Sequence, residues 1–157
     1  MKILALDVAT KTGWACADGS GVFDFSIKRD ESAGMRLVRF KAKLSELKEA
    51  LSPDIVVFER TSGFHKNAII VQSELHGVLK LFCETENLNY RAYSASEIKK
   101  HATGKGNANK QKMIDAAVSK WPEIKVIDDN HADALWIYDL ASNDLMCGQR
   151  WLETGEI

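Results

Sequence analysis

The sequence predicts one mixed α/β domain in which helices flank a five-stranded sheet. Short apolar runs of strand length alternate with longer segments whose apolar residues recur at helical spacing, and the first three strands follow one another directly. A chain of 157 residues with 45% hydrophobic content is long enough to bury one core. The expected order is three strands, then helix, strand, helix, strand and three helices. We expect this domain to span residues 1–146, and residues 147–157 to form a loose polar tail.

The first three strands are expected to form a meander. Residues 2–6 are a largely apolar run, and a polar turn at residues 10–13 separates them from a second apolar run at 14–17. Glycines predict another turn at residues 19–21. Residues 22–27 then alternate in character, which is typical of a half-buried strand.

The later segments are distinguished by their periodicity. Apolar stripes at helical spacing predict amphipathic helices, and a continuous β-branched run predicts a strand covered on both faces. Gly77 lies inside one helix, where we expect it to permit close packing. A capping-box pattern at Ser94 and Glu97 opens a short helix. The main helices are expected at residues 32–51, 67–87, 109–121 and 128–146, and the strands at 55–58 and 88–93.

Composition excludes several classes of protein. No segment has the roughly 18 consecutive apolar residues of a membrane span, so no membrane is expected as a partner. The three cysteines are widely spaced and form no CxxC motif, which argues against a disulfide framework or a structural zinc site and favours a reducing cytoplasm. The first strand begins at once, so no signal peptide is expected. With a net charge of −1, any nucleic-acid surface must be a local patch.

Three acidic residues are predicted at equivalent places in the fold. Asp7 ends the first strand, Glu59 ends the strand predicted to be central, and Asp133 lies one turn into the last helix. Each alone is commonly a turn, cap or surface residue. Together they match the oxygen ligands of hard cations such as Mg²⁺ or Mn²⁺. Two such ions, about 3.5–4 Å apart, can hold the attacking and leaving oxygens of a phosphodiester displacement.

A basic stretch without any acidic residue is the second candidate feature. Such a run is often only a solvated face, but on a near-neutral protein it also fits a surface that contacts phosphates. Glycines at 104 and 106 make its loop flexible. The basic residues are Lys99, Lys100, His101, Lys105, Lys110 and Lys112.

An aromatic residue in a polar loop is the third candidate feature. Phe64 follows Glu59 in a loop at residues 61–67 that also contains Lys66. Its ring is placed either to stack on or wedge between bases, or to fold back onto the core. The residues alone leave both alternatives open.

Taken together, these motifs resemble the RuvC family of Holliday junction resolvases, within the RNase H-like superfamily. The resemblance covers nearly the whole chain, from Lys2 to Leu140. The low pI and short length of the chain resemble those of compact phage-encoded members. It implies an RNase H-like fold. The segments that carry it are ILALD at 3–7, TGW at 12–14, VVFE at 56–59, KNA at 66–68, LHGV at 75–78, YSASEIKK at 93–100, TGKG at 103–106, NK at 109–110 and HADAL at 131–135.

The resemblance also implies roles for individual residues. Asp7, Glu59 and Asp133 would be catalytic metal ligands, and Phe64 would match the aromatic residue near the junction centre. Lys99 or Lys100, together with Lys110, would match the lysines close to the cleaved strand. Apart from the resemblance, Lys66, Lys105 and Lys112 are also expected to contact phosphates.

The fourth metal ligand is less well defined. Family members often have a fourth acid or a histidine three residues before the last aspartate, where this chain has Asn130. Asp129, at i−4 from Asp133, shares its helix face. Asn130 is ranked slightly ahead because it is in register.

The function expected from this resemblance is a Mg²⁺-dependent, structure-selective DNA endonuclease. It would cut four-way or other branched DNA by paired nicks with two ions per site, and Mn²⁺ would substitute for Mg²⁺. Two symmetric nicks imply a homodimer, with the helix at 67–87 near the interface. A branch-migration motor is an open further partner, and the cytoplasm of a bacterial or phage-infected cell is the expected location.

Three other functions are alternatives to this expectation. An actin-like kinase or ATPase would echo the Asp7 hairpin but needs a much longer chain. A related nuclease could act on RNA. A module that binds junctions without cutting would not need three mutually repelling carboxylates.

Overall fold

The structure is a computed structural model that describes residues 1–61 and 66–146. It contains the predicted elements in the predicted order. The predicted positions of Phe64 and of the tail at 147–157 lie outside the described residues. The elements are β1 (Ile3–Asp7), β2 (Lys11–Cys16), β3 (Gly19–Asp24), α1 (Gly34–Leu51), β4 (Ile55–Glu59), α2 (Lys66–Thr85), β5 (Asn89–Tyr93), α3 (Ala95–Thr103), α4 (Lys110–Lys120) and α5 (Asp129–Met146).

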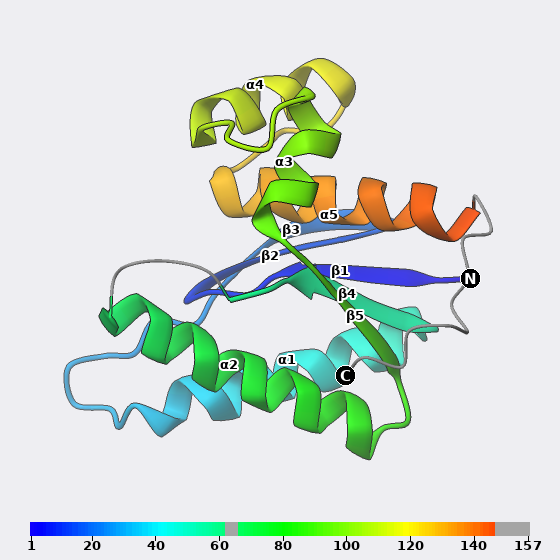
Figure 1. Cartoon of the computed structure of the whole chain (residues 1–157). Coiled ribbons are helices and arrows are strands. Elements are labelled where there is room, and N and C mark those ends of the chain that lie inside the picture. The colour runs from blue at the N-terminus through cyan, green and yellow to red at the C-terminus, as the bar shows by residue number, and fades with distance from the viewer. Residues whose placement is uncertain (62–65, 147–157) are drawn as a thin grey trace.

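The five strands form one mixed sheet in the order β3-β2-β1-β4-β5 (Figure 1). The first three strands are an antiparallel meander, as the sequence predicted. β4 pairs parallel to β1, and β5 pairs parallel to β4. The first strand of the chain is therefore also the centre of the sheet.

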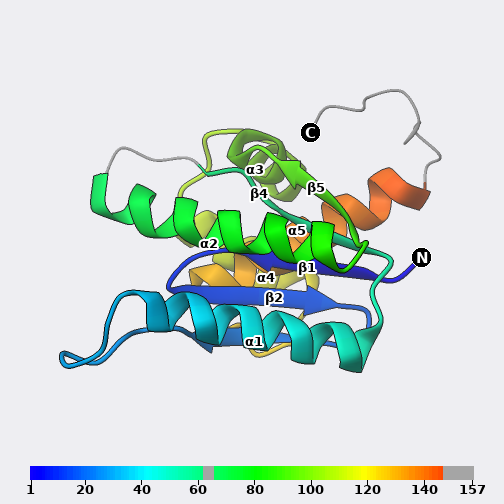
Figure 2. The ribbon, with the colours of Figure 1, turned by 90° about the horizontal axis from the view of Figure 1, so that it is seen from below.

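Helices cover both faces of this sheet. α1 and α2 lie side by side on one face, and α3, α4 and α5 lie on the other (Figures 1 and 2). Each face of the sheet has its own hydrophobic core, and alternate residues of β1 contribute to each. Leu4 and Leu6 pack on the α1–α2 side, whereas Ile3 and Ala5 pack with α5. Within the described parts of the chain, no helix is long and apolar enough to cross a bilayer.

Two of the predicted turns are wrong. β2 begins at Lys11 and β3 at Gly19, so the glycines expected in turns lie within strands. The first turn comes earlier and is closed by the Thr12 hydroxyl, which donates to the carbonyl of Ala9 at 2.6 Å. At Gly21, a Cβ atom would lie 3.0 Å from the indole nitrogen of Trp14. Gly21 is paired with Trp14 across the two strands, so it lies in tight contact with the indole rather than in a turn.

The prediction for Gly77 is also wrong. Gly77 is exposed on α2, and a Cβ atom added to it would meet open space. The capping box at α3 is confirmed, because the Ser94 side chain accepts from the Glu97 amide and the Glu97 carboxylate accepts from the Ser94 amide. It fixes the start of α3, the helix that carries Lys99 and Lys100.

Candidate active site

The pairing of β1 with β4 places Asp7 and Glu59 at the same end of the sheet. Ala5 pairs with Val57 and Leu6 with Phe58, and the two acids are the next residues along each strand. Strand alternation gives Asp7 the same direction as Ala5, and gives Glu59 the same direction as Val57, so both acids face the α5 side. The sequence-based expectation that these two acids face each other therefore fits the register.

The first turn of α5 is brought against this end of the sheet by a close backbone contact. A Cβ atom at Gly13 would lie 1.9 Å from the main-chain oxygen of Asn130, so only glycine permits the approach. Gly13 is the cross-strand partner of Asp7. This contact places the N-terminal turn of α5, which carries Asp133, beside Asp7.

The electrostatics show that the acidic side chains have converged. Burial raises the pKa of Asp7 well above its usual value, and the charges of Asp133, Glu59 and Asp129 raise it further. Burial, and then Glu59 and Asp129, raise the pKa of Asp133 to about 7. Asp7 is only 8% exposed, so water does little to solvate its charge. The site therefore holds more negative charge than its surroundings neutralise.

This donor set fits a hard divalent cation. In the described parts of the chain, no three His, Cys, Asp or Glu side chains are already close enough to hold a metal ion. The carboxylate oxygens are nevertheless the ligand type that Mg²⁺ and Mn²⁺ prefer, and a cation would relieve the repulsion that raises the pKa of Asp7 and Asp133. Asp7, Glu59 and Asp133 are the residues that could hold it.

Lys110 connects the basic stretch to the acidic cluster. It forms an ion pair with Asp129, and this hydrogen bond is the main reason why the pKa of Asp129 is lowered. Its charge also lowers the pKa of Asp7 and Asp133. Lys110 opens α4 directly after the helix cap at Asn109, whose side chain accepts from the Lys112 amide.

The other predicted DNA-binding residues lie on α3, on the loop after it and at the start of α4. Lys99 is close enough to lower the pKa of Asp133, and Lys100, Lys105 and Lys112 are exposed. His101 instead faces α5, where its Nε2 atom lies 2.6 Å from Asp139. The first residue of α2 is Lys66, whose side chain lies outside the described atoms, as does Phe64.

Sequence reasoning missed two polar residues of α2 that reach the ends of the strands. Gln72 donates to the carbonyl of Val8, and the Nε2 atom of His76 lies 2.9 Å from the carbonyl oxygen of Glu59. The sequence signal that could have identified Gln72 and His76 is their spacing of four residues, because this spacing places both on one face of the helix, beside its apolar stripe.

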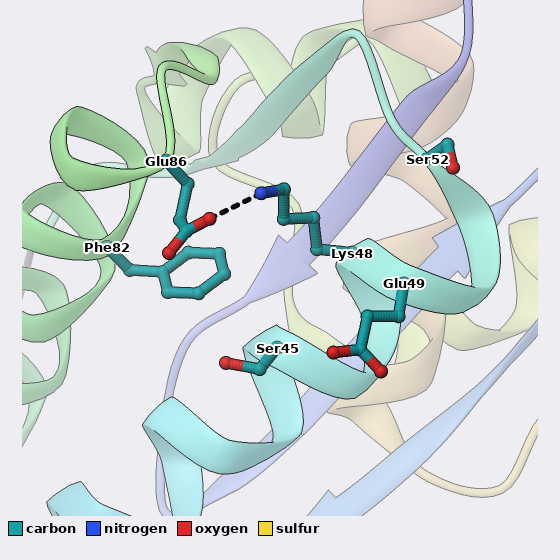
Figure 3. Close-up of a pocket in the computed structure, with 6 residues that line it drawn as sticks. All are labelled: Ser45, Lys48, Glu49, Ser52, Phe82 and Glu86. Carbon is teal, nitrogen blue, oxygen red and sulfur yellow. Dashed lines mark hydrogen bonds and ion pairs between the residues drawn. The ribbon is translucent and has the colours of Figure 1, made fainter.

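A surface pocket lies apart from this site. It is formed between the C-terminal parts of α1 and α2, on the face of the sheet opposite α5, and an ion pair of Lys48 with Glu86 spans it (Figure 3). Its position excludes it from the chemistry of the carboxylates. The lining residues are Ser45, Lys48, Glu49, Ser52, Phe82 and Glu86.

Comparison of the sequence with known proteins gives one consistent family. Residues 19–138 match the family model "Crossover junction endodeoxyribonuclease RuvC". The RuvC of Brachyspira hyodysenteriae is 31% identical over 111 residues, which cover 69% of this chain and 68% of that protein. The RuvC of Caldicellulosiruptor saccharolyticus is 29% identical over 151 residues, which cover 86% of this chain and 88% of that protein.

Solved structures show the same fold. The RuvC structure of Thermus thermophilus has a TM-score of 0.77 at 18% identity and covers 94% of this chain and 97% of its own. The same protein in complex with a Holliday junction substrate has a TM-score of 0.76, also at 18% identity, and covers 94% and 96%. The predicted RNase H-like sheet flanked by helices is thereby confirmed. By the match to its family model and to these relatives, the chain belongs to the RuvC family of crossover junction endodeoxyribonucleases.

Proposed function

We propose that this chain is a metal-dependent endonuclease that resolves four-way DNA junctions by paired nicks. The observation that carries the proposal is the convergence of Asp7, Glu59 and Asp133 at one end of the sheet, in a chain of the RuvC family. The Thermus thermophilus relative was solved with a Holliday junction substrate, which supports branched DNA as the substrate class.

We propose Mg²⁺ as the natural cofactor, with two ions per site and Mn²⁺ as a substitute. Bound divalent ions would supply a nucleophilic water at neutral pH and charge stabilisation at the leaving oxygen. Asp7, Glu59 and Asp133 would hold the ions. Lys110 and Lys99, whose charges already act on the acidic cluster, would contact the phosphates of the strand to be cut.

For the fourth metal ligand we place Asp129 ahead of Asn130. The charge of Asp129 acts on both Asp7 and Asp133, which indicates that its carboxylate lies near theirs. Asn130 contributes its main chain to the contact with Gly13. Mn²⁺ titration would separate the two, because Asp129→Asn should weaken binding more than Asn130→Ala does.

We propose a homodimer that forms through α1 and α2. Two symmetric nicks need two active sites, and a two-fold dimer matches the symmetry of a four-way junction. Large apolar side chains are exposed on this side, with Val38 at 59%, Ile70 at 57% and Leu81 at 63%. An apolar groove lies between the two helices, lined by residues that include Leu37 and Val78. A second copy on this surface would leave the carboxylate end of each sheet free for DNA.

The decisive experiment compares substrates and metals. Purified protein would be incubated with a labelled four-way junction, a linear duplex and RNA, with and without Mg²⁺. Paired nicks on the junction alone, only with metal, are expected. Cleavage of RNA would favour the related RNA nuclease, and tight binding without any cleavage would favour a non-cutting junction-binding module.

Asp7→Asn supplies the matched control, because it keeps the shape of the side chain and removes its charge. We expect this variant to bind the junction but not to cut it. Unchanged cleavage would rule out the proposed role of the carboxylate cluster.

We also propose the cytoplasm of a bacterial or phage-infected cell as the setting, on the basis of the free thiols of Cys16 and Cys83.

A further inference from the structure

Two side chains of α2 hold the main chain at the ends of the two strands that carry acidic residues. The Nε2 atom of Gln72 donates to the carbonyl oxygen of Val8 at 3.2 Å, and Val8 directly follows Asp7. The Nε2 atom of His76 lies 2.9 Å from the carbonyl oxygen of Glu59 itself. Gln72 and His76 lie one helical turn apart, so one face of α2 contacts both strand ends.

The surroundings of His76 fix its orientation. Its side chain is 5% exposed, and its ring packs on Phe58 with the ring centroids 5.3 Å apart. Its Nδ1 atom lies 3.0 Å from the Thr61 hydroxyl and 2.8 Å from the carbonyl of Gln72. Both ring nitrogens therefore face a main-chain carbonyl, Nδ1 that of Gln72 and Nε2 that of Glu59, and the tautomer that holds the Glu59 carbonyl is the one that carries its proton on Nε2 while Nδ1 accepts from the Thr61 hydroxyl.

The strand ends need such support because the groups they carry repel one another. Asp7 and Glu59 are the last residues of β1 and β4, and the pairing between these two strands ends one residue earlier, at Leu6 and Phe58. Their mutual repulsion contributes to the raised pKa of Asp7. Metal ligands must be held within about 0.5 Å of their productive positions by the residues around them. Gln72 and His76 add hydrogen bonds to the main chain at Val8 and Glu59, just beyond the last residue pair of β1 and β4.

We propose that Gln72 and His76 are positioning residues, which hold the ends of β1 and β4 so that Asp7 and Glu59 can bind metal together. The proposal rests on the proposed function, because it assumes that these carboxylates bind divalent ions. It assigns α2, on the opposite face of the sheet from α5, a direct part in the geometry of the metal site.

The test compares variants that lose or keep the donor. His76→Leu and Gln72→Leu remove it, whereas His76→Gln retains an amide donor that can reach the Glu59 carbonyl. Glu74→Gln is the matched control, because Glu74 is an exposed neighbour on the same helix. Mn²⁺ affinity would be measured on the DNA-free protein by electron paramagnetic resonance, alongside single-turnover junction cleavage and metal-free junction binding.

We expect His76→Leu and Gln72→Leu each to weaken Mn²⁺ binding by about 10-fold or more, as is typical when a residue supporting a metal ligand is lost. Junction binding without metal should stay unchanged, and His76→Gln should recover most of the affinity. The proposal is overturned if folded Leu variants bind Mn²⁺ within about twofold of wild type. If His76→Leu does not fold, Gln72→Leu and the comparison of His76→Gln with wild type decide the question.

The same measurements distinguish this inference from the proposed function. Wild-type protein that neither binds Mn²⁺ nor cuts junctions would overturn both. Wild-type protein that binds Mn²⁺ and cuts, beside Leu variants with unchanged Mn²⁺ affinity, would overturn only the positioning role.

Discussion

Asp133 links the active site to the pH of the solution. Its pKa is raised to about 7 by burial and by Glu59 and Asp129, so the folded chain keeps a proton that the unfolded chain loses near pH 4. The protonated Asp133 therefore contributes to the free energy of unfolding at low pH, and this contribution is lost as the pH rises from about 4 to about 7. Asp7, whose pKa is raised for similar reasons, acts in the same direction.

We expect metal-free Asp133→Asn to match wild type near pH 4 and to exceed its stability by a few kcal/mol near pH 8, since one pKa unit corresponds to about 1.4 kcal/mol. Urea unfolding at both pH values measures the difference. Mg²⁺ should reduce it by stabilising only the wild type. A wild type that gains on the variant as the pH rises would contradict this prediction.

Lys110 is expected to contribute one phosphate contact. Lys110→Ala should weaken junction binding and reduce the slope of log affinity against log salt by about 0.9, the value for one contact. Binding titrations across a range of salt concentrations measure the slope. Lys125, which is exposed beyond the C-terminal end of α4, provides the control: Lys125→Ala should leave the slope unchanged. An unaltered slope for Lys110→Ala would reject the contact.

At the scale of elements, the contact between β2 and α5 sets where the last helix begins. A methyl group at Gly13 would overlap the main-chain oxygen of Asn130, so Gly13→Ala should push the first turn of α5 away from the sheet. We expect a loss of about 1–3 kcal/mol in the free energy of unfolding and weaker Mn²⁺ binding. Thermal unfolding and Mn²⁺ titration measure the two effects.

Gly77→Ala is the matched control for Gly13→Ala. A Cβ atom at Gly77 meets open space on α2, so alanine should raise helix stability by up to about 1 kcal/mol without affecting the metal. If Gly13→Ala proved as stable and as metal-competent as Gly77→Ala, the contact would not determine the position of α5.

The elements also show what the sequence could predict. Helices and strands were predictable because apolar periodicity reports burial, and the capping pattern at Ser94 marked a real helix start. The turns were not, because glycine is used both for turns and for close packing. Gly13 is required by its contact with the main chain of α5, which is distant in sequence, and Gly21 lies in tight contact with Trp14 on the neighbouring strand.

At the scale of the whole molecule, the exposed apolar surface over α1 and α2 is the expected interface of the proposed homodimer. Leu81→Asp should give a monomer by light scattering with little loss of stability, because Leu81 is 63% exposed. Val118→Asp on α4, which is 49% exposed, is the control and should remain dimeric. A dimeric Leu81→Asp protein would place the interface elsewhere. The monomer should nick junctions singly rather than in pairs.

The candidate site was partly predictable at this scale. Asp7 and Glu59 stand at strand ends, and a single assumption, that the first and fourth strands are neighbours, brought them together. Asp133 lies on a distant helix, and it joined them through a second assumption, that this helix crosses the same end of the sheet. Gln72 and His76 are spaced four residues apart on one face of α2, but spacing alone does not reveal which main-chain carbonyls their side chains contact.

The division of the site between the first strand and the last helix has a consequence for protein synthesis. Asp7 leaves the ribosome early and Glu59 follows, but Asp133 emerges only with α5. A growing chain carries its lysines at 99–112 before it carries the last carboxylate. With Asp133 as a proposed metal ligand, translation products that stop ahead of α5 are expected to contact DNA through these lysines without being able to cut it.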